Sequence, residues 1–175
     1  MIVRAVRPEE HHALGALTVA AYRALLGPDM DAGYADELAD VTRRAALADV
    51  LVAVDDDGRL VGGITYIPGP GPMAWFAGDG EAGMRMLAVD PAVQGRGAGA
   101  LLVAACIERA EAAGKSRLLL HTTEPMTVAH RLYERAGFHR DPDTDEVLDD
   151  GLVLLGYALD VGGRVEPPRP GGGIG

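Results

Sequence analysis

The sequence predicts a mixed α/β domain, and three observations point to it. Short apolar runs such as Val50–Val54 alternate along the chain with longer segments of helical periodicity. The segment from Ala82 to His121 is typical of a strand, a helix and a second strand, which implies a right-handed parallel crossover. The apolar runs on either side of Asp55-Asp56-Asp57-Gly58 predict an antiparallel hairpin, so the sheet is mixed. A chain of 175 residues suits one domain, which we expect over 1–161, followed by a Pro/Gly-rich tail over 162–175.

Local signals set the order of the elements. The first helix begins at Arg7-Pro8-Glu9-Glu10, where proline stands in the first turn and acids lie beside the positive helix end. It ends at Gly27-Pro28, and a second helix is expected over 31–48 because apolar residues recur there at helical spacing. The other expected helices are 97–113 and 125–136, and the expected strands are 2–6, 50–54, 60–67, 82–89, 117–121 and 152–159.

Composition and charge exclude several classes of protein. Sixteen Lys and Arg against 26 Asp and Glu give a net charge of −10, which argues against nucleic acid or an anionic membrane as a partner. We expect a cytoplasmic protein, because the start resembles no signal peptide and no apolar run is long enough to span a membrane. The single cysteine, Cys106, excludes an internal disulfide and lies in the apolar body of a helix, where we expect it to be buried. Ser116 follows a helix and precedes a strand, which excludes the nucleophile elbow of a serine hydrolase.

No metal site is predicted. His121, His130 and His139 are not spaced as in a zinc-binding H-E-x-x-H motif. The run from Asp141 to Asp145 lacks the glycine and the terminal glutamate of a calcium-binding loop, so we expect it to be a solvated loop.

The stretch Gln94-Gly95-Arg96-Gly97-Ala98-Gly99-Ala100 predicts an anion-binding loop. Its three alternate glycines stand at the start of a predicted helix, where free N–H groups and the helix dipole favour negative charge. Arg96 adds a full positive charge. The alternative to an anion-binding loop is a strand-to-helix turn in which the glycines only allow the backbone geometry. A dinucleotide-binding motif fits poorly, because residues 90–94 separate the glycines from their strand and no acid ends the next strand.

Two motifs together resemble one known family. Leu87-Ala88-Val89-Asp90-Pro91 followed by Gln94-Gly95-Arg96-Gly97-Ala98-Gly99 resembles the acyl-CoA loop, Q/R-x-x-G-x-G/A, of the GNAT N-acetyltransferases. Ala129 to Phe138, which reads AHRLYERAGF, is similar to the second signature of that family, A-x-x-L-Y-E-x-x-G-F. A helix and a strand separate the two motifs, as in the family. The resemblance covers about residues 50–160 and implies a three-layer fold whose central mixed β-sheet splays between strands 82–89 and 117–121.

The resemblance also implies a co-substrate and its binding residues. Acetyl-CoA would donate an acetyl group to an amine, with no metal required. By position, the Leu87 amide would hold the thioester carbonyl, Val89 would pair with the pantetheine, and the amides of 95–100 would surround the pyrophosphate. The implied cofactor-binding residues are Leu87, Val89, Gln94, Gly95, Arg96, Gly97, Ala98, Gly99 and Ala100. Met126 stands where the family often has an asparagine, which removes one polar contact to the cofactor arm.

The resemblance suggests catalytic roles for two residues. Tyr133 would lie near the sulfur as general acid, since a phenol with a pKa of about 10 is protonated at pH 7; an aromatic ring that only packs is the alternative. The position of the base in histone-type members falls on Gly83. Glu81 lies on the same face of the strand and could act as base through a water, or be a solvated carboxylate. His121 at the end of the next strand is a further candidate, or a satisfied interior histidine.

The acceptor is expected to be a small-molecule or peptide amine. The family implies that the second helical region and the loop before the last strand flank the acceptor site. Both regions are rich in Asp and Glu, which would favour cationic acceptors in a salt-sensitive way, with ordinary surface solubility as the alternative. Trp75 and Phe76 would cover an apolar edge or form a contact in a homodimer. The alternative to catalysis is an acyl-CoA-binding or regulatory module that kept the loop.

Overall fold

The computed structural model describes residues 1–162, so the expected tail lies outside the described residues except at Gly162. One eight-stranded sheet runs in the order β1-β2-β3-β4-β5-β8-β6, and β7 also pairs with β8. The strands are β1 Ile2–Ala5, β2 Asp49–Val54, β3 Leu60–Ile67, β4 Glu81–Val89, β5 Arg117–Thr122, β6 His139–Arg140, β7 Glu146–Val147 and β8 Val153–Asp160. The α-helices are α1 His11–Leu26, α2 Ala32–Ala39, α3 Val41–Leu47, α4 Ala98–Ala112 and α5 Thr127–Arg135, and the 3₁₀-helices are η1 Pro8–Glu10, η2 Pro91–Val93 and η3 Pro142–Thr144.

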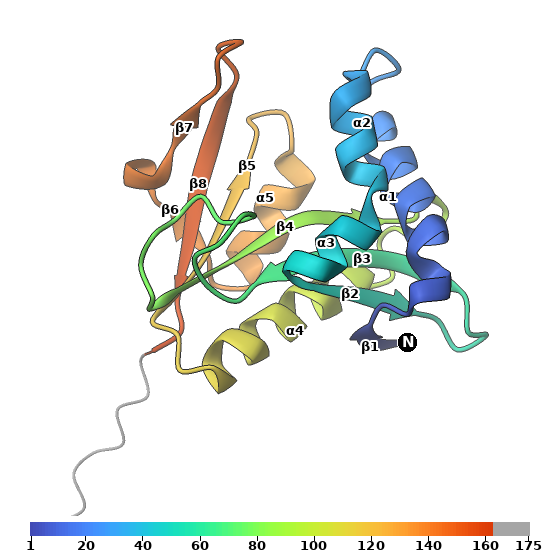
Figure 1. Ribbon diagram of the computed structural model, residues 1–175, viewed down its shortest axis with the longest axis horizontal. Coiled ribbons are helices and arrows are strands. Elements are labelled where there is room, and N and C mark those ends of the chain that lie inside the picture. Colours follow the sequence, from blue (N-terminus) through green and yellow to red (C-terminus); the bar gives the residue numbers. More distant parts are fainter. Residues whose placement is uncertain (163–175) are drawn as a thin grey trace, which may run out of the picture.

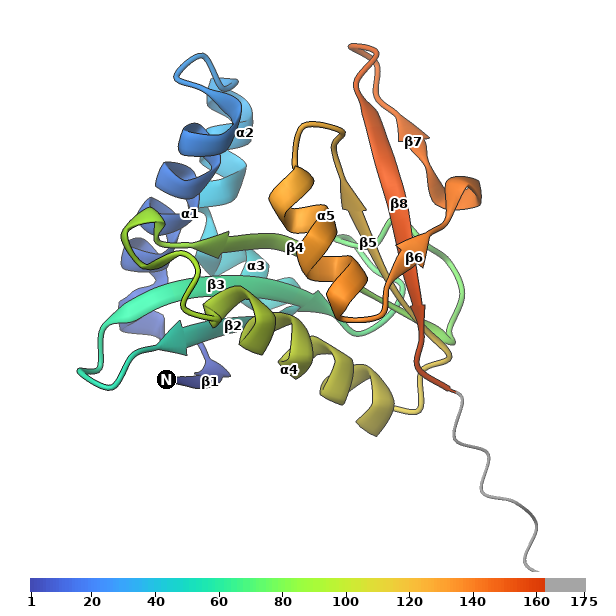
Figure 2. The ribbon, with the colours of Figure 1, turned by 180° about the vertical axis from the view of Figure 1, so that it is seen from behind.

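Helices cover both faces of the sheet, which confirms the predicted three-layer mixed α/β fold. Figure 1 shows α3 in front of β2 and β3, and the view from behind in Figure 2 shows α4 and α5 across the other face. Because side chains alternate along a strand, β2 serves both layers. Its residues Val50, Val52 and Val54 pack with Leu14 of α1 and Val41 of α3. Its residues Leu51 and Ala53 instead belong to the larger core cluster, which also contains residues of α4.

The sheet splays between β4 and β5, as the resemblance implies. These two strands pair in parallel only from Glu81–Arg117 to Met84–Leu120, although β4 continues to Val89 and β5 to Thr122. Figure 1 shows the two strands starting together and then diverging, with α5 behind the space between them. This space, bounded by residues 85–89 and 121–122, is called the β4–β5 gap below.

A bulge in β4 turns the strand at the start of the gap. Gly63 of β3 pairs with Ala88 and Thr65 pairs with Arg85, so two β4 residues, Met86 and Leu87, stand opposite one β3 residue. Met86 has a φ of +55°, which is rare for a residue with a side chain. A bulge leaves one residue outside the ladder and increases the local twist, which directs β4 away from β5.

Two expectations about the elements were wrong. The single helix expected over 31–48 is two helices, α2 and α3, because the chain turns at Asp40 with a ψ of 69°. The Asp40 carboxylate accepts a hydrogen bond from Arg43 N at 2.9 Å and caps α3, which offers the backbone an alternative to a continuous helix. The segment between α5 and β8, expected as a loop, contains the two-residue strands β6 and β7.

Within residues 1–162, the structure has no helix of the length and apolar character needed to cross a membrane. The same part of the chain has no group of three or more His, Cys, Asp or Glu side chains arranged to hold a metal ion. Cys106 is fully buried, and burial raises the pKa of its thiol to about 12, so it is not a nucleophile.

Candidate active site

The glycine-rich loop lies at the N-terminus of α4 and faces open space. Gly95 and Gly97 have φ values of +82° and +89°, and an added Cβ at either would meet nothing within 4 Å. Leu101 N donates to Gly97 O at 3.0 Å, so the amides of 98–100 precede the helical ladder and have no acceptor within it. No acid stands in the first turn of α4. We call residues 95–100 the amide cradle; its free N–H groups and the helix dipole fit an anionic group such as a pyrophosphate.

One edge of β4 is open beside the amide cradle. Val89 pairs with Gly62 on the β3 side, whereas the β5 side has no strand partner beyond Met84 in the described sheet. Unpaired N–H and C=O groups along a strand edge bind extended chains. The edge from Arg85 to Val89 therefore suits a pantetheine arm, and the bulge places Leu87 within this edge.

Tyr133 lies on α5, behind the β4–β5 gap. It is 8% exposed, and the centroid of its ring is 6.0 Å from that of Phe138 and 6.5 Å from that of Tyr157. Burial raises the pKa of its hydroxyl, so the group stays protonated at neutral pH. The ring is thus part of the hydrophobic core, as expected if Tyr133 only packs. Its hydroxyl is also protonated, as the hydroxyl of a proton donor must be.

Aromatic rings fill the space above Gly83, on the face of β4 opposite α4 and α5. A Cβ added there would lie 2.7 Å from Phe76 Cε1 and 2.9 Å from Trp75 Cη2, so this position has room only for glycine. Both rings come from the loop of residues 68–80, which joins β3 to β4 and crosses the front of β4 and β5 in Figure 1. The place where histone-type relatives have a base is therefore filled by the neighbouring loop.

Glu81 stands at the start of β4, away from the gap. Its carboxylate lies 3.6 Å from Arg117 Nη1 and accepts a hydrogen bond from Gly78 N at 3.3 Å. Glu81 precedes Leu87 by six residues, which is about 20 Å along an extended strand. An amine near Leu87 can therefore reach Glu81 only through a chain of several waters.

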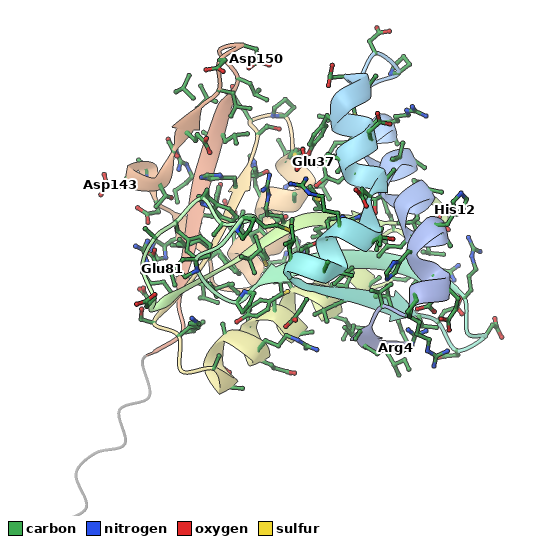
Figure 3. The ribbon with its side chains drawn as sticks, viewed as in Figure 1. Arg4, His12, Glu37, Glu81, Asp143 and Asp150 are labelled. Carbon is green, nitrogen blue, oxygen red and sulfur yellow. The ribbon has the colours of Figure 1, made fainter. Side chains whose placement is uncertain are left out.

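A cavity of about 460 Å³ adjoins Glu81 on the face of the sheet opposite α4 and α5. We call it the aromatic cavity. Its lining residues are Trp75, Phe76, Glu81, Leu119, His121, Asp143, Thr144, Asp145 and Glu146. Figure 3 shows Glu81 and Asp143 on the same side of the molecule, at the start of β4 and at η3.

His121 forms the wall of this cavity nearest the β4–β5 gap. It is the first β5 residue after the last β4–β5 pair, Met84–Leu120. Its Nε2 lies 2.6 Å from Thr144 O and must carry a proton, because a carbonyl oxygen can only accept. Its Nδ1 lies 3.8 Å from the carboxylate of Glu146, and its ring centroid is 4.9 Å from that of Trp75.

Several acids of the expected acceptor rims have structural partners. Asp31 and Asp40 cap α2 and α3. Asp141 pairs with Arg117, and Asp145 makes a two-point pair with Arg140 that lowers its pKa to about 2. Glu37, Asp143 and Glu146 have no Lys or Arg partner within 4.0 Å in residues 1–162. Figure 3 shows Glu37 beside α2, across the gap from Asp143 and Asp150.

Comparison with known proteins agrees with this geometry. The model of the acetyltransferase (GNAT) family matches residues 17–138, which is more than half of the chain. The chain belongs to this family. An uncharacterized N-acetyltransferase of Schizosaccharomyces pombe is 34% identical over 105 residues, a match that spans 59% of this chain and 60% of that relative.

Solved structures share the GNAT fold with this chain. An acetyltransferase of the GNAT family from Staphylococcus aureus Mu50 superposes with a TM-score of 0.71 at 14% identity, covering 91% of this chain and 98% of that one. The Salmonella typhimurium protein yncA, solved with its cofactor acetyl-CoA, has a TM-score of 0.66 at 21% identity, covering 95% and 96%. At these identities the likeness establishes the fold.

The GNAT domain also contains a polar cluster that sequence reasoning missed. Arg44 of α3 is 3% exposed and donates to Thr65 Oγ1 at 3.0 Å and Leu38 O at 2.8 Å. Tyr22 of α1 and Tyr34 of α2 meet edge to face at 6.0 Å, and burial raises the pKa of both. These residues come from three helices, so no local motif could have indicated their proximity.

Arg85 is a second residue that the sequence did not single out. Its side chain donates to Met73 O at 3.3 Å, and its guanidinium carbon lies 5.9 Å from the centroid of the Trp75 ring. It stands two residues before Leu87, on the same face of β4 as Gly83. No carboxylate lies within 4.0 Å of it in residues 1–162. Alternation along the predicted strand could have indicated that Arg85 lies on the same face as Gly83.

Proposed function

We propose that this GNAT domain transfers an acetyl group from acetyl-CoA to the primary amine of a small-molecule or peptide acceptor. One observation carries the proposal: the amide cradle, in which Gly95 and Gly97 face open space, lies beside the open edge of β4 at the β4–β5 gap. The cradle provides several N–H donors for a pyrophosphate, and the edge provides a partner for an extended arm that ends near Leu87.

Acetyl-CoA supplies a thioester, whose C–S bond breaks as the C–N bond to the amine forms. The amides of 95–100, with Arg96, hold the pyrophosphate through charge-assisted hydrogen bonds. The Leu87 amide, at the bulge where the pairing of β4 with β3 is irregular, would polarise the thioester carbonyl. Gln94 and Val89 flank these two contacts and align the arm with β4.

Tyr133 is proposed as the proton donor to the departing sulfur. It lies on the α5 side of the gap, opposite the face from which an acceptor would approach. Its raised pKa makes complete proton transfer harder, but it keeps the hydroxyl protonated as a hydrogen-bond donor to a developing thiolate. The proton lost by the amine passes to solvent, along a chain of waters toward Glu81, with His121 as the nearer alternative.

The acceptor approaches from the side of α2 and the β7–β8 turn. Acids without a Lys or Arg partner lie on both sides, among them Glu37 and Asp143, and support a cationic acceptor. Their attraction for a cation acts over a shorter distance as the salt concentration rises. The homodimer and the cytoplasmic location expected from the sequence stay predictions. The packing of Trp75 and Phe76 onto Gly83 places both rings within the fold of a single chain.

The test is release of free thiol from acetyl-CoA in the presence of a panel of amines, with calorimetry of acetyl-CoA binding in parallel. We expect amine-dependent thiol release and a kcat/KM that falls as ionic strength rises. Binding of acetyl-CoA without turnover of any amine would favour the non-catalytic acyl-CoA-binding module instead. Turnover that does not depend on ionic strength would contradict a cationic acceptor but would still support acetyl transfer.

A further inference from the structure

We propose that Tyr22 of α1 positions the attacking amine: its hydroxyl oxygen accepts a hydrogen bond from the amine nitrogen, so that the lone pair of that nitrogen faces the thioester carbon. This inference rests on the proposed acetyl transfer, because it assigns a further catalytic residue to the same reaction. Tyr133 would act on the sulfur from the α5 side of the β4–β5 gap. Tyr22 would hold the amine on the opposite side.

Helix α1 brings Tyr22 to the β4–β5 gap. Leu14, Thr18 and Tyr22 follow at intervals of four residues, so they lie on one face of the helix. This face is turned to the sheet, because Leu14 and Thr18 are fully buried and a Cβ added to Gly63 of β3 would lie 2.5 Å from Leu14 Cδ1. Gly63 pairs with Ala88, in the part of β4 that borders the gap. Figure 1 shows α1 running across the direction of β3 and β4, and Tyr22 stands about 12 Å further along the helix than Leu14, past β4.

The hydroxyl of Tyr22 is available to a ligand. It accepts no hydrogen bond from any protein group within residues 1–162. Tyr22 is half-buried and its hydroxyl is not enclosed, whereas the hydroxyl of Tyr66 is buried without a partner. The ring of Tyr34 on α2 supports that of Tyr22 edge to face at 6.0 Å. A phenol oxygen held in this way can accept a hydrogen bond from an amine.

Tyr133 borders the same space from the α5 side. Its ring is 8% exposed, but its hydroxyl is not among the enclosed polar atoms that lack a partner. Burial raises the pKa of Tyr22 well above its usual value, and Tyr34 and Tyr133 raise it further, so the phenols of Tyr22 and Tyr133 are close enough to interact. An acceptor nitrogen between them would have the proton donor to sulfur on one side and Tyr22 on the other.

The charges around Tyr22 suit an amine that is neutral before it reacts. Besides the two tyrosines, the groups that change the pKa of Tyr22 are Arg44 and Arg85, which lower it, and no Asp or Glu of residues 1–162 is among them. A carboxylate in this place would stabilise the unreactive ammonium, whereas a neutral phenol accepts a hydrogen bond without a full negative charge.

The hydrogen bond to Tyr22 strengthens as the reaction proceeds. The lone pair of the amine forms the C–N bond, the electrons of the C–S bond pass to sulfur, and the nitrogen becomes positively charged until its extra proton passes to water. Hydrogen bonds from a charged donor are stronger than those from a neutral one. The interaction therefore stabilises the transition state more than the bound amine, and Tyr22 keeps its own proton throughout.

Tyr22→Phe tests the inference, because it removes the hydroxyl and keeps the ring that packs on Tyr34. The probe is the primary amine of the panel that the parent acetylates fastest. We expect kcat/KM for this amine to fall roughly 10- to 150-fold, the range for one hydrogen bond to a charged group. Most of the loss should be in kcat. The Kd for acetyl-CoA and the acidic limb of the pH profile should not change, because Tyr22 neither binds the cofactor nor takes the proton of the amine.

Two other tyrosines provide controls. Tyr66→Phe is the matched control: it removes a buried phenol hydroxyl from the core cluster that contains residues of α4, and it should keep the kcat/KM of the parent. Tyr34→Phe removes the hydroxyl of the supporting ring and should lower kcat/KM by less than Tyr22→Phe does. Circular dichroism confirms that each variant is folded.

The possible outcomes separate this inference from the proposed function. If Tyr22→Phe acetylates the amine at the parent rate, the inference is wrong while acetyl transfer stands. Equal losses in Tyr22→Phe and Tyr34→Phe would assign the effect to the packing of the two rings and would also overturn it, as would a loss confined to acetyl-CoA binding. If the parent acetylates no amine, the proposed function fails and the inference fails with it.

Discussion

One methyl group added to the amide cradle tests how the cradle binds acetyl-CoA. Gly97 has a φ of +89°, and a Cβ at this position would meet no protein atom within 4 Å. Gly97→Ala therefore creates no clash within the protein, and its only intrinsic cost is a left-handed backbone, about 1–2 kcal/mol. In a domain of this size that cost lowers Tm by roughly 2–8 °C and leaves the protein folded.

The effect on acetyl-CoA should be much larger than the effect on folding. The methyl group would enter the space in front of the cradle where a pyrophosphate oxygen must approach the amides. Loss of one charge-assisted amide bond costs about 1.5–3 kcal/mol. We therefore expect the Kd for acetyl-CoA, measured by isothermal calorimetry, to rise roughly 10- to 150-fold.

Gly114 provides the matched control at the other end of α4. Its φ is +66°, and an added Cβ there also meets nothing within 4 Å. Gly114→Ala should therefore lose a similar amount of stability with an unchanged Kd. If the two variants bind acetyl-CoA equally well, the amide cradle does not hold the cofactor and the reasoning is refuted.

Three further predictions concern other parts of the domain. Tyr133→Phe should lower kcat by roughly 10²-fold in the thiol-release assay, leave the KM for acetyl-CoA nearly unchanged and cost less than about 1.5 kcal/mol of stability; a parent-like kcat would mean that the ring only packs. Arg44→Ala should cost about 2 to 4 kcal/mol in urea unfolding because it strands the buried acceptors of its two hydrogen bonds, whereas exposed Arg43→Ala should change stability by at most ~0.5 kcal/mol. Burial raises the pKa of all five tyrosines, so the folded state holds protons that the unfolded chain releases near pH 10. The stabilisation is fully present below pH ~10 and is lost above it, so tyrosinate absorbance should rise together with loss of the folded circular dichroism signal. The tyrosines are Tyr22, Tyr34, Tyr66, Tyr133 and Tyr157.

Features encoded within a few neighbouring residues could be predicted from the sequence. The βαβ unit from β4 to β5 follows from the periodicity of three consecutive segments, and the amide cradle follows from glycines at a helix start. The prediction that the sheet splays came from the resemblance to GNAT proteins. Its physical cause, the bulge at Met86, depends on the register between β3 and β4, which no local pattern reports.

Features that depend on contacts between distant segments could not be predicted. Residues 31–48 have an apolar stripe, but the side chain of Asp40 caps a new helix and ends the old one. Trp75 and Phe76 were expected to cover an apolar edge or form a contact in a homodimer, but the sequence could not indicate that the missing side chain of Gly83 admits both rings to the face of β4. Arginine is a residue type usually found at the surface, so the sequence gives no sign that Arg44 is buried. Its hydrogen bonds to α2 and β3 compensate for the loss of solvent around its charge.

The distribution of charge along β4 answers a difficulty of the proposed reaction. A primary amine with a pKa near 10.4 is protonated at pH 7, and its deprotonation costs about 4.6 kcal/mol. Carboxylates close to the reacting nitrogen would increase that cost, because they stabilise the ammonium. Glu81, the cavity carboxylate that lies on β4, is instead about 20 Å along the strand from Leu87, whereas Arg85, two residues from Leu87, favours the neutral amine. Arg85→Gln should therefore shift the acidic limb of the kcat/KM profile to higher pH, and an unshifted limb would show that Arg85 has no influence on the amine.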